Sequence, residues 1–261
     1  MIVFTNDKKR LQKHCEKDPV LFAYHLGDLD DFYFPDCQWA SIYGDRPHIE
    51  DLVLLYYGCH TPTVLAFGLT DRFGELMRDV TNILPDAFYC HFQKTSLPIL
   101  CEMHDYRPLG THLKMSLDSF TPIDTSSHTR SIRRLTTEHE SALQKLYAHS
   151  YPGNYFTSRM LETGKYFGYF DGDAIVGVAG VHVDSTTYRV AVLGNITTAD
   201  SHRGKGIGTA LTSTLVAELT NEKKLVCLNV RADNEPAIRC YRKLGFVVRH
   251  EYEEGLFTRT G

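Results

Sequence analysis

The chain has 261 residues, of which 43% are hydrophobic and 23% are charged, an ordinary globular composition with room for one large domain or two modest ones. Its formal net charge of -4 gives no general attraction to nucleic acid or to an anionic membrane, so neither is expected as a partner. The start turns polar at Asp7 before an apolar signal core can form, and no later segment is long enough to span a membrane, so we expect a cytoplasmic protein.

The first part of the chain alternates helical and strand-like segments, which is typical of a mixed α+β domain. Helices are predicted over residues 9–17, 20–29, 72–84 and 96–103, and strands over 39–43, 52–57, 63–67, 87–92 and 113–117. The segment that follows is polar, contains proline and lacks periodicity. We therefore interpret residues 121–129 as a linker between an N-terminal domain, 1–120, and a C-terminal domain, 130–261.

The second part also predicts an α+β domain, with sharper element boundaries. Asp171-Gly172-Asp173 predicts a hairpin turn because glycine and aspartate accept the positive φ that such turns demand. Asn234, two residues before a proline, predicts a helix start, and Gly245 predicts its end. Strands are predicted over residues 132–135, 166–170, 174–183, 188–197, 225–230 and from 246 onward, and helices over 138–149, 157–162, 207–222 and 236–244.

A glycine-rich string, Arg203-Gly204-Lys205-Gly206-Ile207-Gly208, joins a predicted strand to a predicted helix. The first N–H groups of a helix have no intrahelical acceptors, so they bind an anion that can approach closely. The three glycines remove the Cβ atoms that would keep phosphate oxygens away, while Arg203 and Lys205 add positive charge at the rim. A Walker A loop and a dinucleotide fingerprint both need other glycine spacings. We interpret the string as a pyrophosphate-binding turn.

Two motifs in this order resemble the GCN5-related N-acetyltransferase (GNAT) superfamily. The signature R/Q-x-x-G-x-G/A is matched by Arg203, Gly206 and Gly208, and residues 234–246, NEPAIRCYRKLGF, resemble the second motif at the expected distance. The resemblance covers about half of the chain. It implies a mixed, mostly antiparallel sheet whose fourth and fifth strands splay apart to admit the pantetheine arm of a cofactor. The co-substrate implied is acetyl-CoA or another acyl-CoA, without a metal.

The resemblance also assigns roles to single residues. The backbone of Ile196 and Thr198 would pair with the pantetheine amides, and the Ile196 N–H would stabilise the oxyanion. Asn234 would bind the cofactor as well as cap its helix, and Tyr241 would protonate the departing thiolate, with simple core packing as the alternative. The matching cofactor-binding positions are Ile196, Thr197, Thr198, Arg203, Gly204, Lys205, Gly206, Ile207, Gly208, Thr209, Asn234, Ala237 and Tyr241.

A base is also needed, because most amines are protonated at neutral pH. Family members often have a glutamate on the fourth strand, where this chain has Asn195, which cannot accept a proton. His182 has a fitting pKa and is the catalytic candidate; Asp184, a water chain, or a merely packed His182 remain open. We expect Asn195, Tyr155 and Phe156 at the acceptor end, where the two aromatic side chains either line a substrate pocket or cap the core.

The N-terminal part lacks a glycine-rich turn before a helix and should not bind a cofactor of its own. Its element order suggests a degenerate copy of the same fold, as in tandem members that resemble glycine N-acyltransferases. For the whole chain we expect an N-acetyltransferase that acts on a primary amine of a small molecule or amino acid. A donor with a longer acyl chain and a catalytically silent acyl-CoA sensor are the alternatives, and a homodimer is one option for the assembly.

Overall fold

The computed structural model describes residues 2–44, 48–222 and 224–261, which fold into two compact units. The first unit comprises Met1–Lys114, Arg231–Asp233 and Arg249–Gly261, and the second comprises Met115–Val230 and Asn234–Val248. The end of the chain thus packs in the first unit. The division into domains at residues 121–129 stays a prediction. No helix among the described residues has the length and apolar character needed to cross a membrane.

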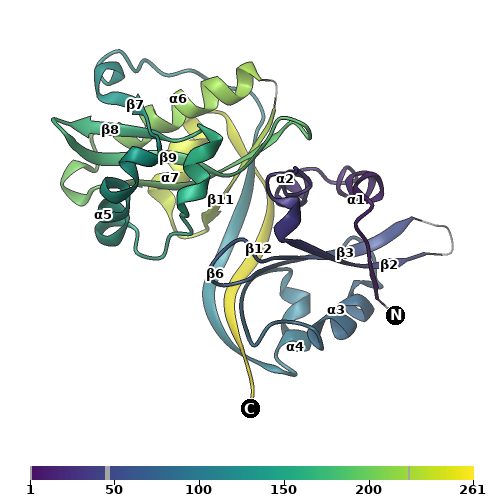
Figure 1. Ribbon diagram of the computed structural model, residues 1–261. Coiled ribbons are helices and arrows are strands. Elements are labelled where there is room, and N and C mark those ends of the chain that lie inside the picture. The colour runs from purple at the N-terminus through teal and green to yellow at the C-terminus, as the bar shows by residue number, and fades with distance from the viewer. Residues whose placement is uncertain (1, 45–47, 223) are drawn as a thin grey trace. The chain divides into compact units, whose positions relative to one another are not determined.

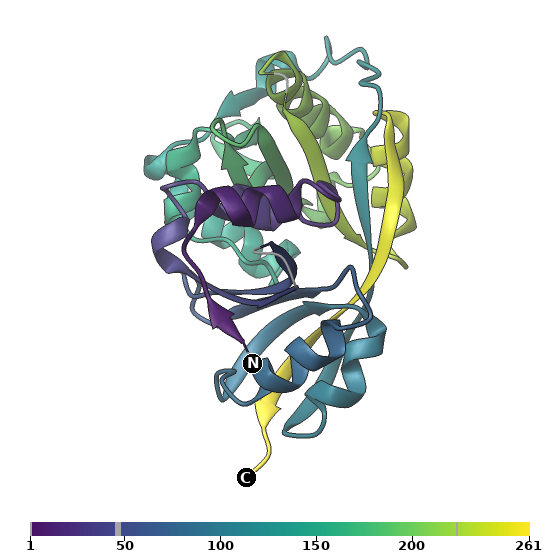
Figure 2. The same ribbon diagram turned by 90° about the vertical axis from the view of Figure 1, so that its right-hand side faces the viewer.

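The first unit is a mostly antiparallel sheet with helices on both faces. Strands β1 to β4 pair antiparallel in order, β5 runs parallel to β4, and the end of β12 (Phe246–Arg259) pairs antiparallel with β5. Figures 1 and 2 show α1 and α2 on one face of these strands and α3 and α4 on the other. The elements are β1 (Val3–Phe4), α1 (Lys8–Cys15), α2 (Ala23–Asp28), β2 (Cys37–Tyr43), β3 (Ile49–Tyr56), β4 (Thr63–Phe67), α3 (Phe73–Thr81), β5 (Ala87–Phe92), α4 (Leu97–Leu100) and β6 (His104–Leu117).

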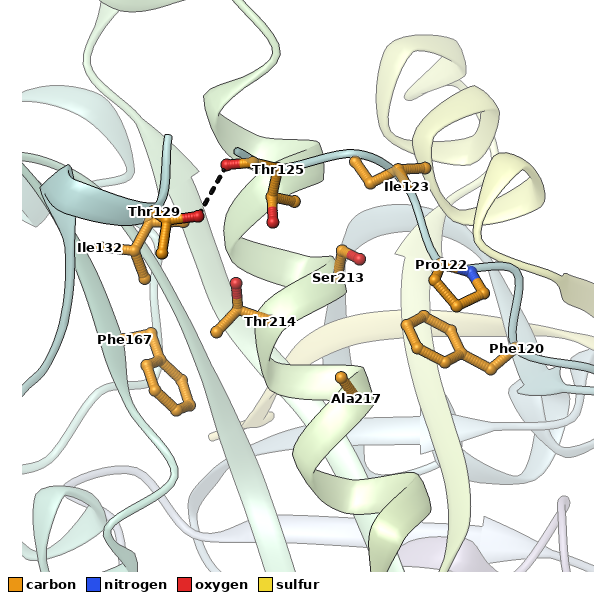
Figure 3. A pocket seen from close by; sticks show the side chains of 10 residues that line it. All are labelled: Phe120, Pro122, Ile123, Thr125, Thr129, Ile132, Phe167, Ser213, Thr214 and Ala217. Atoms are coloured by element: carbon orange, nitrogen blue, oxygen red, sulfur yellow. Dashed lines mark hydrogen bonds between the residues drawn. The ribbon is translucent and has the colours of Figure 1, made fainter. Parts of the chain in front are cut away.

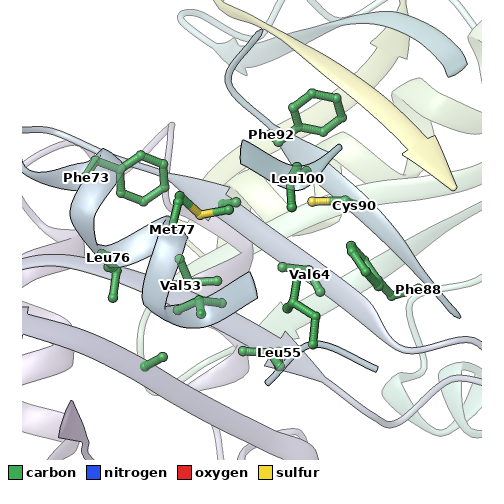
Figure 4. Packing of buried hydrophobic residues seen from close by; sticks show 14 of the residues in the cluster. Val53, Leu55, Val64, Phe73, Leu76, Met77, Phe88, Cys90, Phe92 and Leu100 are labelled. Atoms are coloured by element: carbon green, nitrogen blue, oxygen red, sulfur yellow. The ribbon is translucent and has the colours of Figure 1, made fainter. Parts of the chain in front are cut away.

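Apolar side chains explain this layering. Because helices cover both faces, β3 carries a continuous buried run, Leu52 to Leu55, in place of an alternating pattern. Helix α3 places Phe73, Leu76, Met77 and Val80 at the spacing of one helical face, and all four are buried. Figure 4 shows this face against side chains of the neighbouring strands. Each such side chain contributes about 1.5–3 kcal/mol by leaving water.

The second unit repeats the pattern. Strands β7 to β10 pair antiparallel, and β11 runs parallel to β10. The hairpin between β8 and β9 turns at Gly172, whose φ is 60°, as the sequence predicted. The helix predicted over residues 157–162 is instead a 3-10 helix, Ser158–Thr163, which ends at Gly164 in the left-handed region. The main elements are β7 (Ile132–Arg134), α5 (Glu140–Ser150), β8 (Phe167–Asp171), β9 (Ala174–Ser185), β10 (Val190–Thr198), α6 (Ile207–Asn221), β11 (Leu225–Arg231) and α7 (Glu235–Lys243).

The two units share one element order. Each unit contains, in chain order, a strand, two helices, three antiparallel strands, a helix, a strand parallel to the third of these strands, a helix and a last strand. In the second unit the 3-10 helix occupies the position that α2 has in the first. The parallel pairs, β4 with β5 and β10 with β11, fall at the same place in both orders. This confirms the predicted α+β class and the predicted copy of the fold in the N-terminal part.

In the first unit, the side chains of Asp51 and Gln93 form hydrogen bonds with the backbone of the turn between β4 and α3. The buried Asp51 carboxylate accepts hydrogen bonds from the Leu69 N–H at 2.6 Å and from the Thr70 hydroxyl. The Gln93 side chain donates to the Gly68 carbonyl and accepts from the Gly68 N–H, both at 3.1 Å. Side chains of the first unit therefore satisfy the backbone groups of this turn.

Asp51→Ala is expected to destabilise the first unit by about 1–3 kcal/mol, because it leaves the Leu69 N–H without its acceptor. A lower midpoint of urea unfolding would report this loss, and Asp51→Asn, which keeps one acceptor oxygen, should lose less. Affinity for acetyl-CoA, measured in parallel, should not change. Unfolding midpoints that match the wild type would show that this carboxylate does not hold the turn.

Candidate functional site

The turn between β10 and α6 is exposed and open. Gly204 and Gly206 have φ values of 75° and 79°, in the left-handed region that favours glycine. A Cβ added at Gly204 would meet nothing within 4 Å, and residues 203–206 are all exposed. Helix α6 begins at Ile207 without a side-chain cap and without an acidic residue in its first turn. Its first N–H groups can therefore receive an anion.

Basic side chains surround this turn. Arg203 is 58% exposed and pairs with Asp200 at 2.8 Å, so part of its charge is already neutralised, whereas Lys205 is exposed. The third basic side chain at this turn is His128. It was not predicted from the sequence, because it lies in the predicted linker, where no motif marks it. Its Nε2 lies 3.6 Å from the position of a Cβ on Gly206, and its Nδ1 is 3.4 Å from the Tyr169 hydroxyl.

Strands β10 and β11 separate beside this turn. Their parallel register runs from Val190 opposite Leu225 to Leu193 opposite Leu228 and goes no further among the described residues. Both strands nevertheless continue, to Thr198 and Arg231. Residues 196–198 are half-buried at the separation. An extended chain can thus pair with the backbone of β10 there, next to the open turn.

The comparisons with known proteins agree with this arrangement. The model of the acetyltransferase (GNAT) family matches residues 131–246. These residues form a GNAT family domain. Members of this family bind acyl-CoA, and the open turn and the separated strands lie inside the matched range. A comparison with curated proteins gives no match.

Solved structures match almost the whole chain. A Drosophila protein covers 96% of this chain over 87% of its own, with 14% identity and a TM-score of 0.67. A GNAT family acetyltransferase from Colwellia psychrerythraea covers 100% of both chains, with 13% identity and a TM-score of 0.57. A tandem GNAT protein from the clavulanic acid biosynthesis pathway covers 98% of both, with 13% identity and a TM-score of 0.56. At such identities the likeness establishes the fold.

A bulge interrupts β10 of the GNAT domain at Asn195. Its φ is 55°, and the register with β9 shifts between Gly194 and Thr197. Asparagine tolerates this conformation better than most residues. The Asn195 side chain is buried, donates to the Tyr166 hydroxyl at 3.0 Å and accepts from the Tyr155 N–H at 3.3 Å. The structure therefore brings the predicted acceptor residues Asn195 and Tyr155 together.

The other predicted acceptor residue, Phe156, packs inward. Its ring centroid lies 5.3 Å from that of Tyr147 and 5.8 Å from that of Tyr166. This contact favours the interpretation that Phe156 caps the core.

His182 lies across Gly194, directly beside the bulge. A Cβ on Gly194 would come within 2.3 Å of the imidazole ring, so a larger residue there would displace His182. Burial lowers the pKa of His182 below its usual 6.5, and the contact with Asn195 opposes that shift. The imidazole is therefore neutral at pH 7. The other candidate base, Asp184, has a carboxylate 2.6 Å from the ammonium of the buried Lys224 and is held in that ion pair.

Helix α7 places the second motif. Asn234 caps it by accepting from the Ala237 N–H at 3.3 Å, as predicted. Tyr241 is only 8% exposed, and burial raises the pKa of its phenol, so it stays protonated at neutral pH. Burial likewise raises the pKa of the Cys240 thiol, which hydrogen-bonds to Thr209 of α6. Cys240 thus behaves as a packed thiol.

A cavity of about 480 Å³ lies along α6, away from these residues (Figure 3). The Thr129 hydroxyl donates to the Thr125 carbonyl at 3.0 Å on its rim. None of its lining residues belongs to the predicted site. Those residues are Phe120, Pro122, Ile123, Thr125, Thr129, Ile132, Phe167, Ser213, Thr214 and Ala217.

Proposed function

We propose that this protein is an N-acetyltransferase that moves an acetyl group from acetyl-CoA to a primary amine of a small molecule or amino acid. The observation that carries the proposal is the uncapped, exposed start of α6 next to the separated strands β10 and β11, inside a GNAT domain. Two glycines of this turn have positive φ, and their surroundings leave room for phosphate oxygens to approach the backbone N–H groups.

The residues present fit an acyl-CoA. Backbone N–H groups of residues 204–208 would hold the diphosphate, with Lys205 and Arg203 at the rim. The backbone of Ile196 and Thr198 would pair with the pantetheine amides in the manner of an added strand. Asn234, which caps α7 through its side-chain oxygen, keeps its amide nitrogen for a hydrogen bond to the same molecule. Acetyl-CoA, when bound, supplies the acetyl thioester that the amine attacks.

The reaction forms a C–N bond at the thioester carbon and breaks the C–S bond. Negative charge develops on the carbonyl oxygen, where the Ile196 N–H would donate a hydrogen bond. The proton lost from the amine goes to a base, for which His182 is the candidate on this sheet. Tyr241 would donate a hydrogen bond to the departing sulfur. Because the pKa of its phenol is raised, complete transfer of its proton to a thiolate, whose conjugate acid has a pKa of about 8.5, is uphill.

The proposal is tested by titration calorimetry with acetyl-CoA and by an assay of free thiol release across a panel of small amines. Binding together with amine-dependent thiol release supports it. Binding without thiol release on any amine favours the catalytically silent acyl-CoA sensor. Faster thiol release from longer acyl-CoAs than from acetyl-CoA favours a donor with a longer acyl chain. Failure to bind any acyl-CoA would overturn the proposal.

A pH profile tests the base. If His182 takes the amine proton, its neutral form is the active one. The value of kcat/KM, calculated on the concentration of neutral amine so that the titration of the substrate itself is removed, should therefore fall on acidification, with an apparent pKa below 6.5. The lowered pKa moves this limb to more acidic pH than an ordinary histidine would give. In His182→Gln the limb should vanish and the rate at neutral pH should fall about 10²-fold or more. A variant with the same acidic limb would exclude His182 as the base.

A further inference from the structure

A hydroxyl group from α5 holds the bulge of β10. The Tyr147 hydroxyl donates to the Asn195 carbonyl at 2.8 Å, and Tyr147 is itself only 2% exposed. Burial raises the pKa of this phenol, so the donor hydrogen is always present. The Asn195 side chain is fixed separately, through Tyr166 and Tyr155. The backbone and the side chain of one residue thus have different anchors.

The carbonyl direction sets the direction of the next N–H. No described peptide bond is cis, so the C=O of Asn195 and the N–H of Ile196 point in opposite directions across one plane. Because Tyr147 of α5 holds the carbonyl, the Ile196 N–H is aimed away from α5. Ile196 is half-buried, whereas Asn195 is buried, and Ile196 lies in the stretch of β10 that no longer pairs with β11.

We propose that Tyr147 is a positioning residue that aims the Ile196 N–H at the thioester carbonyl oxygen of the bound acyl donor. The inference rests on the proposed function. The alternative orientation of this peptide would turn the Asn195 carbonyl toward the developing oxyanion, where two negative oxygens would repel each other. Asn195 sits at a φ of 55°, which few residues other than glycine adopt, and the hydrogen bond from Tyr147 favours the productive orientation of the peptide that follows it.

The direct readout is the carbonyl stretching frequency of acetyl-CoA labelled with carbon-13 at the acetyl carbonyl. Bound to the wild type, the carbonyl should absorb at lower frequency than in solution, because the Ile196 N–H polarises it. In Tyr147→Phe this shift should largely disappear. The same variant should lose about 10- to 100-fold in kcat, with less than about a threefold change in KM for acetyl-CoA, because only one oxyanion donor is misaligned.

Tyr166→Phe is the matched control, since it removes another buried hydroxyl next to Asn195 that touches the side chain and not the carbonyl. It should keep the carbonyl shift even if its unfolding temperature falls as much as that of Tyr147→Phe. A carbonyl shift that is absent from the wild type, or equal in the wild type and Tyr147→Phe, would overturn the inference while leaving acetyl-CoA binding intact. Failure of the wild type to bind acetyl-CoA would overturn the proposed function and this inference together.

Discussion

Gly206→Val is expected to abolish acetyl-CoA binding, weakening the affinity by at least about 100-fold, or some 2.7 kcal/mol. Two causes act together. The φ of 79° at this position is a genuine outlier for a β-branched residue, so the turn must rearrange. The new side chain would also stand beside His128 and over the N–H groups at the start of α6, where phosphate oxygens need to approach. Titration calorimetry with acetyl-CoA measures the change.

The control for this substitution is Gly172→Val. Gly172 also has a positive φ, 60°, and lies in open space at the hairpin between β8 and β9. The two variants should lose similar unfolding free energy, about 1–2 kcal/mol from backbone strain. Only Gly206→Val should lose acetyl-CoA. A folded Gly206→Val protein that binds acetyl-CoA as the wild type does would rule out the diphosphate at this turn.

Tyr241→Phe is expected to lower kcat by about 10²-fold while changing the Kd for acetyl-CoA by less than about threefold. The phenol is buried and keeps its proton, so its contribution is a hydrogen bond to the leaving sulfur that strengthens as charge develops there. Removing the hydroxyl leaves the ring and its packing against Phe246 in place. Steady-state kinetics with a saturating amine, together with calorimetry, separate the two quantities.

Tyr33→Phe provides the comparison, because it removes a phenol oxygen from a side chain that is 3% exposed in the first unit. Its kcat should match the wild type. If Tyr241→Phe turned over at the wild-type rate, Tyr241 would be a core residue and the sulfur would leave without its help.

Much of the second unit could be predicted because its signals are local. The Gly172 turn, the Asn234 cap and the glycine-rich string each depend on a conformation that few residue types accept, and each lies where it was expected. The strands and helices around them are confirmed to within a few residues at their ends.

The groups that surround the candidate site depend on contacts between distant segments, which no spacing reveals. Tyr147 meets Asn195 across 48 positions, and His128 reaches the Gly206 turn from the predicted linker. The bulge at Asn195 leaves no pattern either, since asparagine is common in strand ends and turns alike. The assigned roles of Tyr241, His182 and Ile196 stay predictions.

Because β12 pairs with β5, the sheet of the first unit can be completed only after the C-terminal residues have been synthesised. Residues Glu253–Thr258 lie opposite Phe92–Ala87, so the first unit lacks an interior strand until residue 258 has left the ribosome. During synthesis, the β5 edge therefore remains without this partner while the whole second unit is translated, which takes about 10 s at ordinary elongation rates. An unpaired strand edge is a template for pairing with other chains, so the nascent chain is open to aggregation over this time.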